Sequence, residues 1–179
     1  EAMGLDPARD RLCLIQIYDG DGDCHLVQFD GFKYNSPNLE KVLNDKNKIK
    51  IFHYARFDMA AIKYALGISL ENIYCTKIAS RLVRTYTQYH GLASLCRELL
   101  GADLSKTEQC SDWGVETLTE SQKHYAASDV LYLHALMAKL DVMLEREGRT
   151  DMARACFDFL PRRAELDLAG WPELDIFSH

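Results

Sequence analysis

The sequence lacks any run close to the roughly 18 consecutive apolar residues that a membrane-spanning helix needs, and we therefore expect a cytoplasmic protein without membrane contact. Its six cysteines are scattered and form no CxxC pair, which is a common spacing of zinc ligands. Zinc is therefore not expected. The cysteines are predicted to be reduced, buried thiols of a cytosolic protein.

A surplus of positive charge is also absent. The chain has 21 Lys and Arg residues against 27 Asp and Glu residues, a formal net charge of −6. Proteins that hold long nucleic acids by their phosphates usually have a basic surplus or a basic stripe. A nucleic acid bound here is therefore expected to be short, or to have its charge compensated by metal ions.

What is present is enough for one domain, residues 1–179, with a sizeable core. Apolar and alternating segments predict strands at residues 12–18, 25–29 and 48–53, the first two joined as a hairpin by the turn DGDGD. This acidic turn has no Glu at the twelfth position of a calcium loop, so calcium binding is not expected there.

Helical spacing dominates the later part of the chain. Capping residues, glycine stops and apolar periodicity predict helices at residues 36–44, 57–66, 78–86, 92–100, 119–147 and 151–159, the last ending before Pro161. Strands that come first and helices that follow indicate an α/β or α+β domain with one mixed sheet flanked by helices.

Acidic and phenolic residues recur beside these elements. Tyr125 and Asp129 are four residues apart and share one helix face. Asp58 begins a helix directly after a strand, and Glu1 precedes the first strand. Each has an ordinary explanation when taken alone, since an exposed Asp beside a half-buried Tyr, or an Asp at a helix start, is common.

Taken together, these residues match a known family. Glu1 with Gly4-Leu5 and RDRLCLIQI resembles the first motif of RNase D-like 3′-5′ exonucleases, and FHYARFD resembles the second, with Asp58 at its acidic position. YAASD resembles the third motif of the tyrosine (DEDDy) subclass, and KTEQCSDW resembles a further segment. The resemblance covers nearly the whole chain. It implies a ribonuclease H-like exonuclease fold with Glu1, Asp58, Tyr125 and Asp129 as catalytic residues.

A narrower resemblance is to the NrnC branch, carried by CTKIASRLVRTYTQYHGL, SDWGVETLT, YAASDVLYLH and FLPRRAELDLAGWPELDIF. It implies cleavage of very short oligonucleotides, dinucleotides above all, and a ring-shaped homo-octamer in which residues 157–179 pack between subunits. The family has an Asp two residues before its first-motif Glu. That position lies upstream of Glu1, so we expect the Asp and its strand there in the natural protein.

The residue types indicate a mechanism. Phosphodiester hydrolysis requires the attacking and leaving oxygens to be neutralised together, which two Mg²⁺ or Mn²⁺ ions about 4 Å apart achieve. Such ions prefer oxygen ligands, and we assign Glu1, Asp58 and Asp129 as the metal ligands. A phenol with a pKa near 10 is a poor base, so Tyr125 is expected to orient the attacking water.

Four further residues are candidates for substrate binding, each with a simpler alternative. Leu5 is expected to wedge against bases or to pack in the core. His53 is expected to contact a phosphate or a sugar, or to be an ordinary core histidine. Lys106 and Gln109 are expected to reach a terminal phosphate or to lie on a solvated face. Trp113, in contrast, is predicted to be a packing anchor.

We therefore expect a metal-dependent 3′-5′ exoribonuclease that converts short RNA or DNA oligonucleotides to nucleoside 5′-monophosphates. One alternative is RNase D-like processing of longer structured RNA, but the chain has no room for accessory RNA-binding helices and is acidic. A second alternative is a non-catalytic binding module with an exonuclease fold. The presence of three carboxylates together with the phenol argues against that reading.

Overall fold

The structure, a computed structural model, describes residues 1–105 and 107–178. Four strands form two small sheets. β1 (Leu14–Ile17) pairs antiparallel with β2 (His25–Gln28), and β3 (Lys50–Phe52) pairs parallel with β4 (Ile73–Cys75). The predicted hairpin is confirmed. β4 was missed in the sequence, because a strand of three residues is too short to show an alternating pattern.

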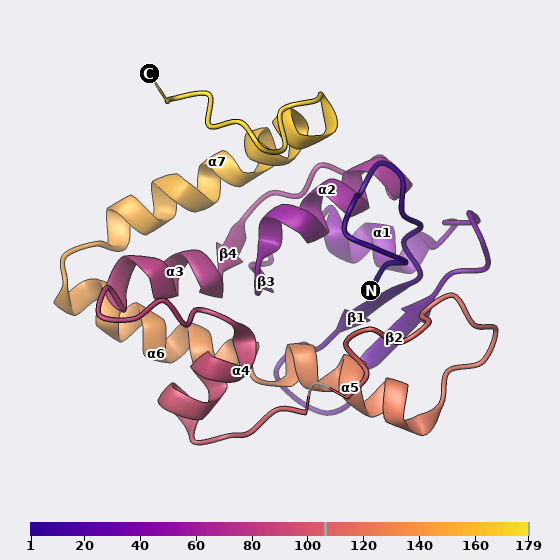
Figure 1. The fold of residues 1–179 in the computed structure, drawn as a ribbon, viewed down its shortest axis with the longest axis horizontal. Coiled ribbons are helices and arrows are strands. Elements are labelled where there is room, and N and C mark those ends of the chain that lie inside the picture. Colours follow the sequence, from indigo (N-terminus) through magenta and orange to yellow (C-terminus); the bar gives the residue numbers. More distant parts are fainter. Residues whose placement is uncertain (106, 179) are drawn as a thin grey trace.

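The expected single mixed sheet is wrong for the described residues. The β1–β2 pair and the β3–β4 pair share no backbone hydrogen bonds and form separate sheets. No described segment runs between β1 and β3 to join them (Figure 1). The main cavity lies between the two sheets, and residues of β1 and β3 line it. The α/β fold class itself is confirmed by the mixture of these strands with surrounding helices.

The helices follow the predicted order. They are α1 (Pro37–Leu43), α2 (Ala55–Leu66), α3 (Thr76–Val83), α4 (Leu92–Leu95), the π-helical turn η1 (Cys96–Leu100), α5 (Glu120–Leu131), α6 (Leu133–Arg146) and α7 (Thr150–Leu168). Gly67 and Gly101 end α2 and η1 with φ of 71° and 68°. Glycine adopts this left-handed geometry without a steric cost, which is why both stops were visible in the sequence.

The single long helix expected at residues 119–147 is divided in two. Tyr132, with φ −97° and ψ −5°, separates α5 from α6. α5 packs against β1 and β2, whereas α6 packs against α3 and α7. No proline or glycine lies at this position to signal the break. The division lets one half of the segment reach the β1–β2 sheet while the other half fills the main core.

The expected end of the last helix before Pro161 is also wrong, because α7 continues through Pro161 to Leu168. A proline inside a helix removes one backbone hydrogen bond and usually kinks the helix. Here Phe157, Leu160 and Ala164 are buried on one face of α7, which packs along α2. Burial of this face on both sides of the proline offsets the lost hydrogen bond.

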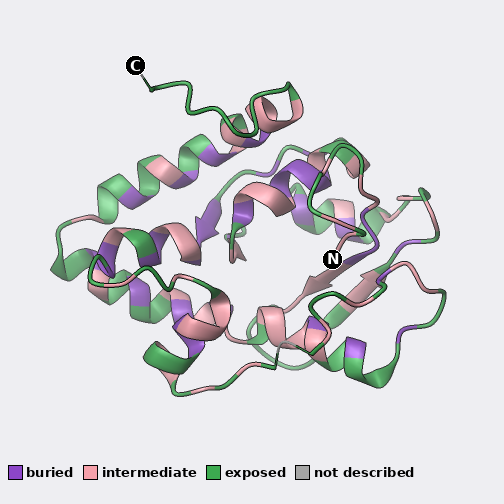
Figure 2. Ribbon diagram, viewed as in Figure 1, coloured by how far each residue is buried: buried purple, intermediate pink, exposed green. Residues whose placement is uncertain are grey.

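Burial is concentrated on the inward faces of these helices (Figure 2). The main core joins α2, α3, α6 and α7 to the β3–β4 sheet. A second, smaller core lies beside β1, where Cys13, Leu14, Trp113, Leu118 and Ala126 are buried together. Within the described part of the chain, no helix is long and apolar enough to cross a membrane.

Candidate active site

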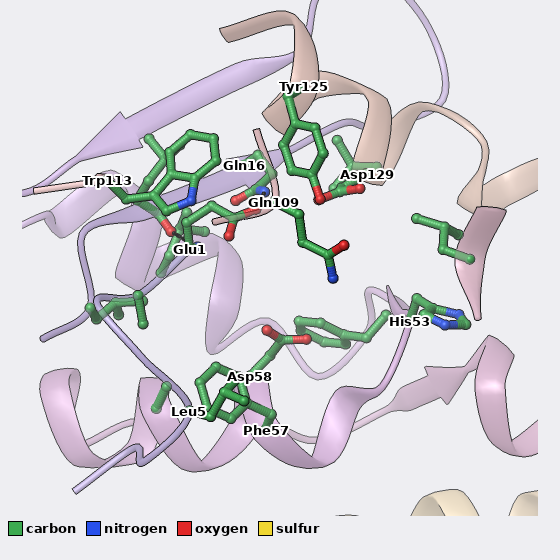
Figure 3. Close-up of a pocket in the computed structure, with 18 of the residues that line it drawn as sticks. Glu1, Leu5, Gln16, His53, Phe57, Asp58, Gln109, Trp113, Tyr125 and Asp129 are labelled. Carbon is green, nitrogen blue, oxygen red and sulfur yellow. Dashed lines mark hydrogen bonds between the residues drawn. The ribbon is translucent and has the colours of Figure 1, made fainter. Parts of the chain in front are cut away.

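A cavity of about 680 Å³ lies between β1, β3, α2 and α5. Most predicted site residues line it: Glu1, Leu5, His53, Asp58, Gln109, Tyr125 and Asp129. Figure 3 shows Glu1, Asp58, Gln109, Tyr125 and Asp129 around one volume, with Leu5 and His53 at its margins. Lys106 lies outside the described residues.

Glu1 is placed by strand-like pairing of the chain start with the residues before β1. Met3 N donates to Arg11 O at 2.9 Å, and Cys13 N donates to Glu1 O at 2.9 Å. The side chain is then oriented by Gln16, whose Nε2 donates to Glu1 Oε1 at 3.3 Å. These contacts join residues more than seven positions apart, and no local sequence pattern indicates them.

Asp58 lies in the first turn of α2, directly after β3. The chain enters α2 through Tyr54, which has the left-handed φ of 68°. Burial raises the pKa of the Asp58 carboxyl to about 7, and the charge of Glu1 adds to this rise. An ordinary helix-start Asp would be solvated and fully ionised, so the simple capping explanation does not account for this residue.

α5 carries the other two predicted catalytic residues. Tyr125 and Asp129 lie on one face and their polar ends meet in the cavity (Figure 3). Burial raises the pKa of Asp129 to about 7, and the Glu1 carboxylate, which shares a hydrogen bond with it, contributes. Burial also raises the pKa of Tyr125, with Asp129 contributing. The phenol therefore keeps its proton at neutral pH and acts as a hydrogen-bond donor.

Three carboxylates thus face a cavity whose described lining includes neither Lys nor Arg. Their geometry is uneven: Glu1 and Asp129 lie together, while Asp58 faces them across the cavity (Figure 3). Among residues 1–105 and 107–178, no three His, Cys, Asp or Glu side chains are grouped closely enough to hold a metal ion. The negative charge and the all-oxygen donor set nevertheless fit hard divalent cations.

The structure distinguishes between the two alternatives for some of the predicted substrate-binding residues but not for all of them. Leu5 is 88% exposed at the cavity rim, so its core-packing alternative is wrong. Gln109 is exposed but its amide extends into the centre of the cavity (Figure 3), so it does not lie on a plain solvated face. His53 lines the end of the cavity that lies away from Glu1 (Figure 3). Trp113 is 2% exposed and packs against Tyr125, with ring centroids 5.9 Å apart, which confirms it as a packing anchor.

The cysteine prediction is partly wrong. All six cysteines are free, and Cys13, Cys75 and Cys96 are buried as expected. Cys110, however, is exposed and lines the cavity next to Gln109. It lies in an irregular loop, where apolar periodicity gives no indication of burial.

Gln122 has a structural role that its sequence position does not fully reveal. It is 4% exposed and completes a capping box with Thr119 at the start of α5. Its Nε2 also donates to Ser111 Oγ at 2.8 Å and to Asp112 O at 2.9 Å. One buried amide thereby fastens the loop that carries Gln109 and Trp113 to the helix that carries Tyr125 and Asp129. The Thr-x-x-Gln spacing predicts the cap but not the loop contacts.

A matched pair of variants tests this role. Gln122→Glu keeps the acceptor for Thr119 N but removes both donors to the loop, and it should cost about 1–3 kcal/mol of unfolding free energy. Thr119→Ala removes the cap and should cost about 1 kcal/mol. Amide exchange of Gly114, which donates to Asp112 Oδ1 at 2.8 Å, should accelerate only in Gln122→Glu. Equal exchange in the two variants would contradict the proposed fastening.

Comparisons with known proteins agree with this geometry. A 3′-5′ exonuclease family model (DNA_pol_A_exo1) matches residues 1–145. Ribonuclease D of Gluconacetobacter diazotrophicus is 33% identical over 140 residues, which is 78% of this chain and 35% of that protein. Ribonuclease D of Escherichia coli is 34% identical over 77% of this chain and 36% of its own length. The chain thus spans about a third of these relatives.

Solved structures include longer matches. A Brucella melitensis NrnC structure described as bound to pGG is 54% identical, with a TM-score of 0.97 over 100% of this chain and 87% of that chain. Another, described as having bound Mg²⁺, is 53% identical with a TM-score of 0.94. Escherichia coli RNase D superposes with a TM-score of 0.78 at 29% identity, over 87% of this chain and 41% of its own. The chain therefore belongs to the 3′-5′ exonuclease family, as an RNase D-like member of the NrnC type.

Proposed function

We propose that this protein is a metal-dependent 3′-5′ exonuclease that hydrolyses very short oligonucleotides, especially dinucleotides, to nucleoside 5′-monophosphates. The observation that carries the proposal is the single cavity in which three carboxylates and a protonated phenol meet without a basic residue in the described lining. Its volume of about 680 Å³ lies within the range of about 300–1,000 Å³ typical of small-ligand pockets. This size suits a short substrate better than helical RNA.

Glu1, Asp58 and Asp129 are the proposed ligands of two Mg²⁺ or Mn²⁺ ions. When bound, such ions supply positive charge for the attacking and leaving oxygens of the phosphodiester. The fourth carboxylate that the family resemblance implies, two residues before Glu1, remains a prediction. In the protein itself, Gln16 orients Glu1, and the first turn of α2 holds Asp58 on the far wall.

Tyr125 is the proposed positioning group for the attacking water. Burial and the nearby Asp129 raise its pKa, so the phenol donates a hydrogen bond rather than accepting a proton. Packing of the Tyr125 ring against buried Trp113 limits its movement. The phenol therefore sets the direction of attack, while the carboxylates provide the negative charge that retains the cations.

The substrate-binding roles of Leu5, Gln109 and Lys106 are also proposals. Leu5 offers an exposed apolar side chain at the cavity rim, which suits contact with a base. Gln109 presents an amide in the cavity centre (Figure 3), which suits contact with a terminal phosphate. The binding of pGG named for the Brucella relative supports a short substrate. The proposal includes both RNA and DNA oligonucleotides as substrates.

The C-terminal segment supports the proposal of a homo-oligomer. The number of eight subunits in a ring and the location in the cytoplasm are proposed from the family resemblance alone. Trp171, Leu174, Ile176 and Phe177 are each 42–67% exposed, and residues 171–177 form an open tail beyond α7 (Figure 2). Asp167 fastens the end of α7 to α2 through Arg56, with Nε to Oδ2 at 2.7 Å. Exposed apolar groups gathered in one segment suit contact with another subunit.

RNase D-like processing of longer structured RNA is the second candidate, favoured by identity to Ribonuclease D proteins. The acidic net charge of −6 weighs against it, because counterion release from phosphates drives the binding of long RNA. Substrate length separates the two candidates.

With the full-length protein and Mn²⁺, we expect 5′-phosphorylated dinucleotides to be cleaved fastest, with rates falling steeply as length rises. A series from 2-mers to 20-mers and a tRNA precursor, analysed on denaturing gels, measures this profile. Equal or faster cleavage of the 20-mer would favour RNase D-like processing. If substrates of every length remain uncleaved, the alternative of a non-catalytic binding module is favoured.

A further inference from the structure

His53 follows β3 at the end of the cavity away from Glu1 (Figure 3). Its partner in the protein is Thr76, a fully buried residue at the start of α3. Thr76 Oγ1 donates to the backbone carbonyl of Phe52 at 3.1 Å. A hydroxyl has one proton, and a carbonyl oxygen can only accept, so this bond uses the proton of Thr76.

The second contact of Thr76 Oγ1 fixes the form of the imidazole. Oγ1 lies 2.9 Å from His53 Nδ1, and because its own proton is already donated, Oγ1 must accept here. His53 therefore carries its proton on Nδ1. In a neutral imidazole the other nitrogen, Nε2, then has a free lone pair, and no residue of the described chain donates a hydrogen bond to it.

The surroundings keep this ring neutral. Burial lowers the pKa of His53 to about 4, and the positive charge of Lys77 contributes. The Lys77 ammonium lies 4.0 Å from the centroid of the Tyr54 ring, and it makes no ion pair in the part of the chain that the structure describes. At neutral pH, His53 thus presents an acceptor and no positive charge at its open nitrogen.

A bare acceptor cannot bind a phosphate oxygen, which at neutral pH also only accepts. The partner of Nε2 must be a donor on the substrate. Donors on the bases differ in kind and position from one base to the next, so a base donor would restrict the enzyme to particular sequences. The terminal 3′-hydroxyl is present in every unmodified dinucleotide and the 2′-hydroxyl in every ribonucleotide, and both can donate.

We propose that Nε2 of His53 accepts a hydrogen bond from a sugar hydroxyl of the substrate, with Thr76 as the positioning residue that sets the tautomer. The assignment rests on the proposed function, because it takes the cavity to be the oligonucleotide site. The hydroxyl is a 2′-hydroxyl or the terminal 3′-hydroxyl. The two have the same chemistry and are separated by the experiment below.

The tautomer can be measured without any substrate. The ¹⁵N chemical shifts of the His53 ring in the full-length protein should show protonated Nδ1 and unprotonated Nε2 at pH 7. Thr76→Ser keeps the hydroxyl and should leave this pattern unchanged, whereas Thr76→Val should disturb it. Protonated Nε2 in the unsubstituted protein would overturn the proposal.

The contact itself is tested by combining variants with modified substrates. Dinucleotides that lack 2′-hydroxyls, or lack the terminal 3′-hydroxyl, are compared in the unsubstituted enzyme, in His53→Phe, which has no acceptor, and in His53→Gln, which retains one. Loss of the relevant hydroxyl should raise KM about 5- to 10-fold in the unsubstituted enzyme, less in His53→Gln, and not at all in His53→Phe.

The substrate whose penalty disappears in His53→Phe identifies the hydroxyl. If both deletions carry the same penalty in His53→Phe as in the active unsubstituted enzyme, the His53 assignment is wrong while the proposed function stands. If the unsubstituted enzyme fails on every dinucleotide, the proposed function is wrong, and the assignment falls with it.

Discussion

Asp129→Asn should reduce dinucleotide hydrolysis by about 10³-fold or more while the protein remains folded. Asp129 is one of three proposed metal ligands, and the loss of several kcal/mol of transition-state charge stabilisation corresponds to a factor of this size. Steady-state kinetics with Mn²⁺ measures the loss, and circular dichroism measures the fold. Asp151→Asn, at an exposed position in the first turn of α7, is the matched control and should retain full activity.

The same substitution should stabilise the metal-free protein at pH 8. Burial raises the pKa of Asp129 to about 7, above its usual value near 4. The contribution of this carboxyl to folding stability is therefore greatest below pH 4 and is lost as the pH rises through 7, because the ionised carboxylate is disfavoured in the fold. A neutral Asn removes this penalty, for which the rise in pKa sets an upper limit of about 4 kcal/mol. Retained turnover, or a large loss of stability, would contradict the assignment.

Divalent ions should stabilise the unsubstituted protein strongly. Ions that neutralise the Glu1, Asp58 and Asp129 carboxylates bind only the folded chain, and a concentration 100-fold above Kd contributes about 2.7 kcal/mol. Excess EDTA should lower Tm at pH 8, and Mg²⁺ or Mn²⁺ should raise it by several degrees. Differential scanning calorimetry measures both shifts.

This stabilisation should also depend on pH. The pKa values of Asp58 and Asp129 are both raised to about 7, so protons compete with the ions below that value. The Tm increase should be largest at pH 8 and nearly absent at pH 5. Asp129→Asn should lose most of it, and the control Asp151→Asn should keep it. An equal increase in both variants would show that the ions bind elsewhere.

Local patterns predicted the parts of the site that depend on short spacing. Tyr125 and Asp129 were placed on one face because four residues make about one helical turn. Asp58 was placed at the start of α2 because a strand and a helix adjoin there. These elements are confirmed, since each is determined by a few consecutive residues.

Features that depend on distant contacts were not visible in the sequence. Pairing of residues 1–3 with residues 11–14 positions Glu1, and the loop contacts of Gln122 link segments 10 or 11 residues apart. The division at Tyr132 arises because two halves of one helical segment pack on different partners. The passage of α7 through Pro161 depends on burial against α2, which outweighs the local preference of proline.

The central claim is that the cavity between β1, β3, α2 and α5 holds the divalent ions of a 3′-5′ exonuclease. Anomalous scattering from crystals of the full-length protein soaked in Mn²⁺ tests it most directly. We predict Mn²⁺ in contact with the carboxylates of Glu1, Asp58 and Asp129, and its loss in Asp129→Asn. Mn²⁺ bound only outside this cavity, in a protein that hydrolyses dinucleotides, would contradict the claim.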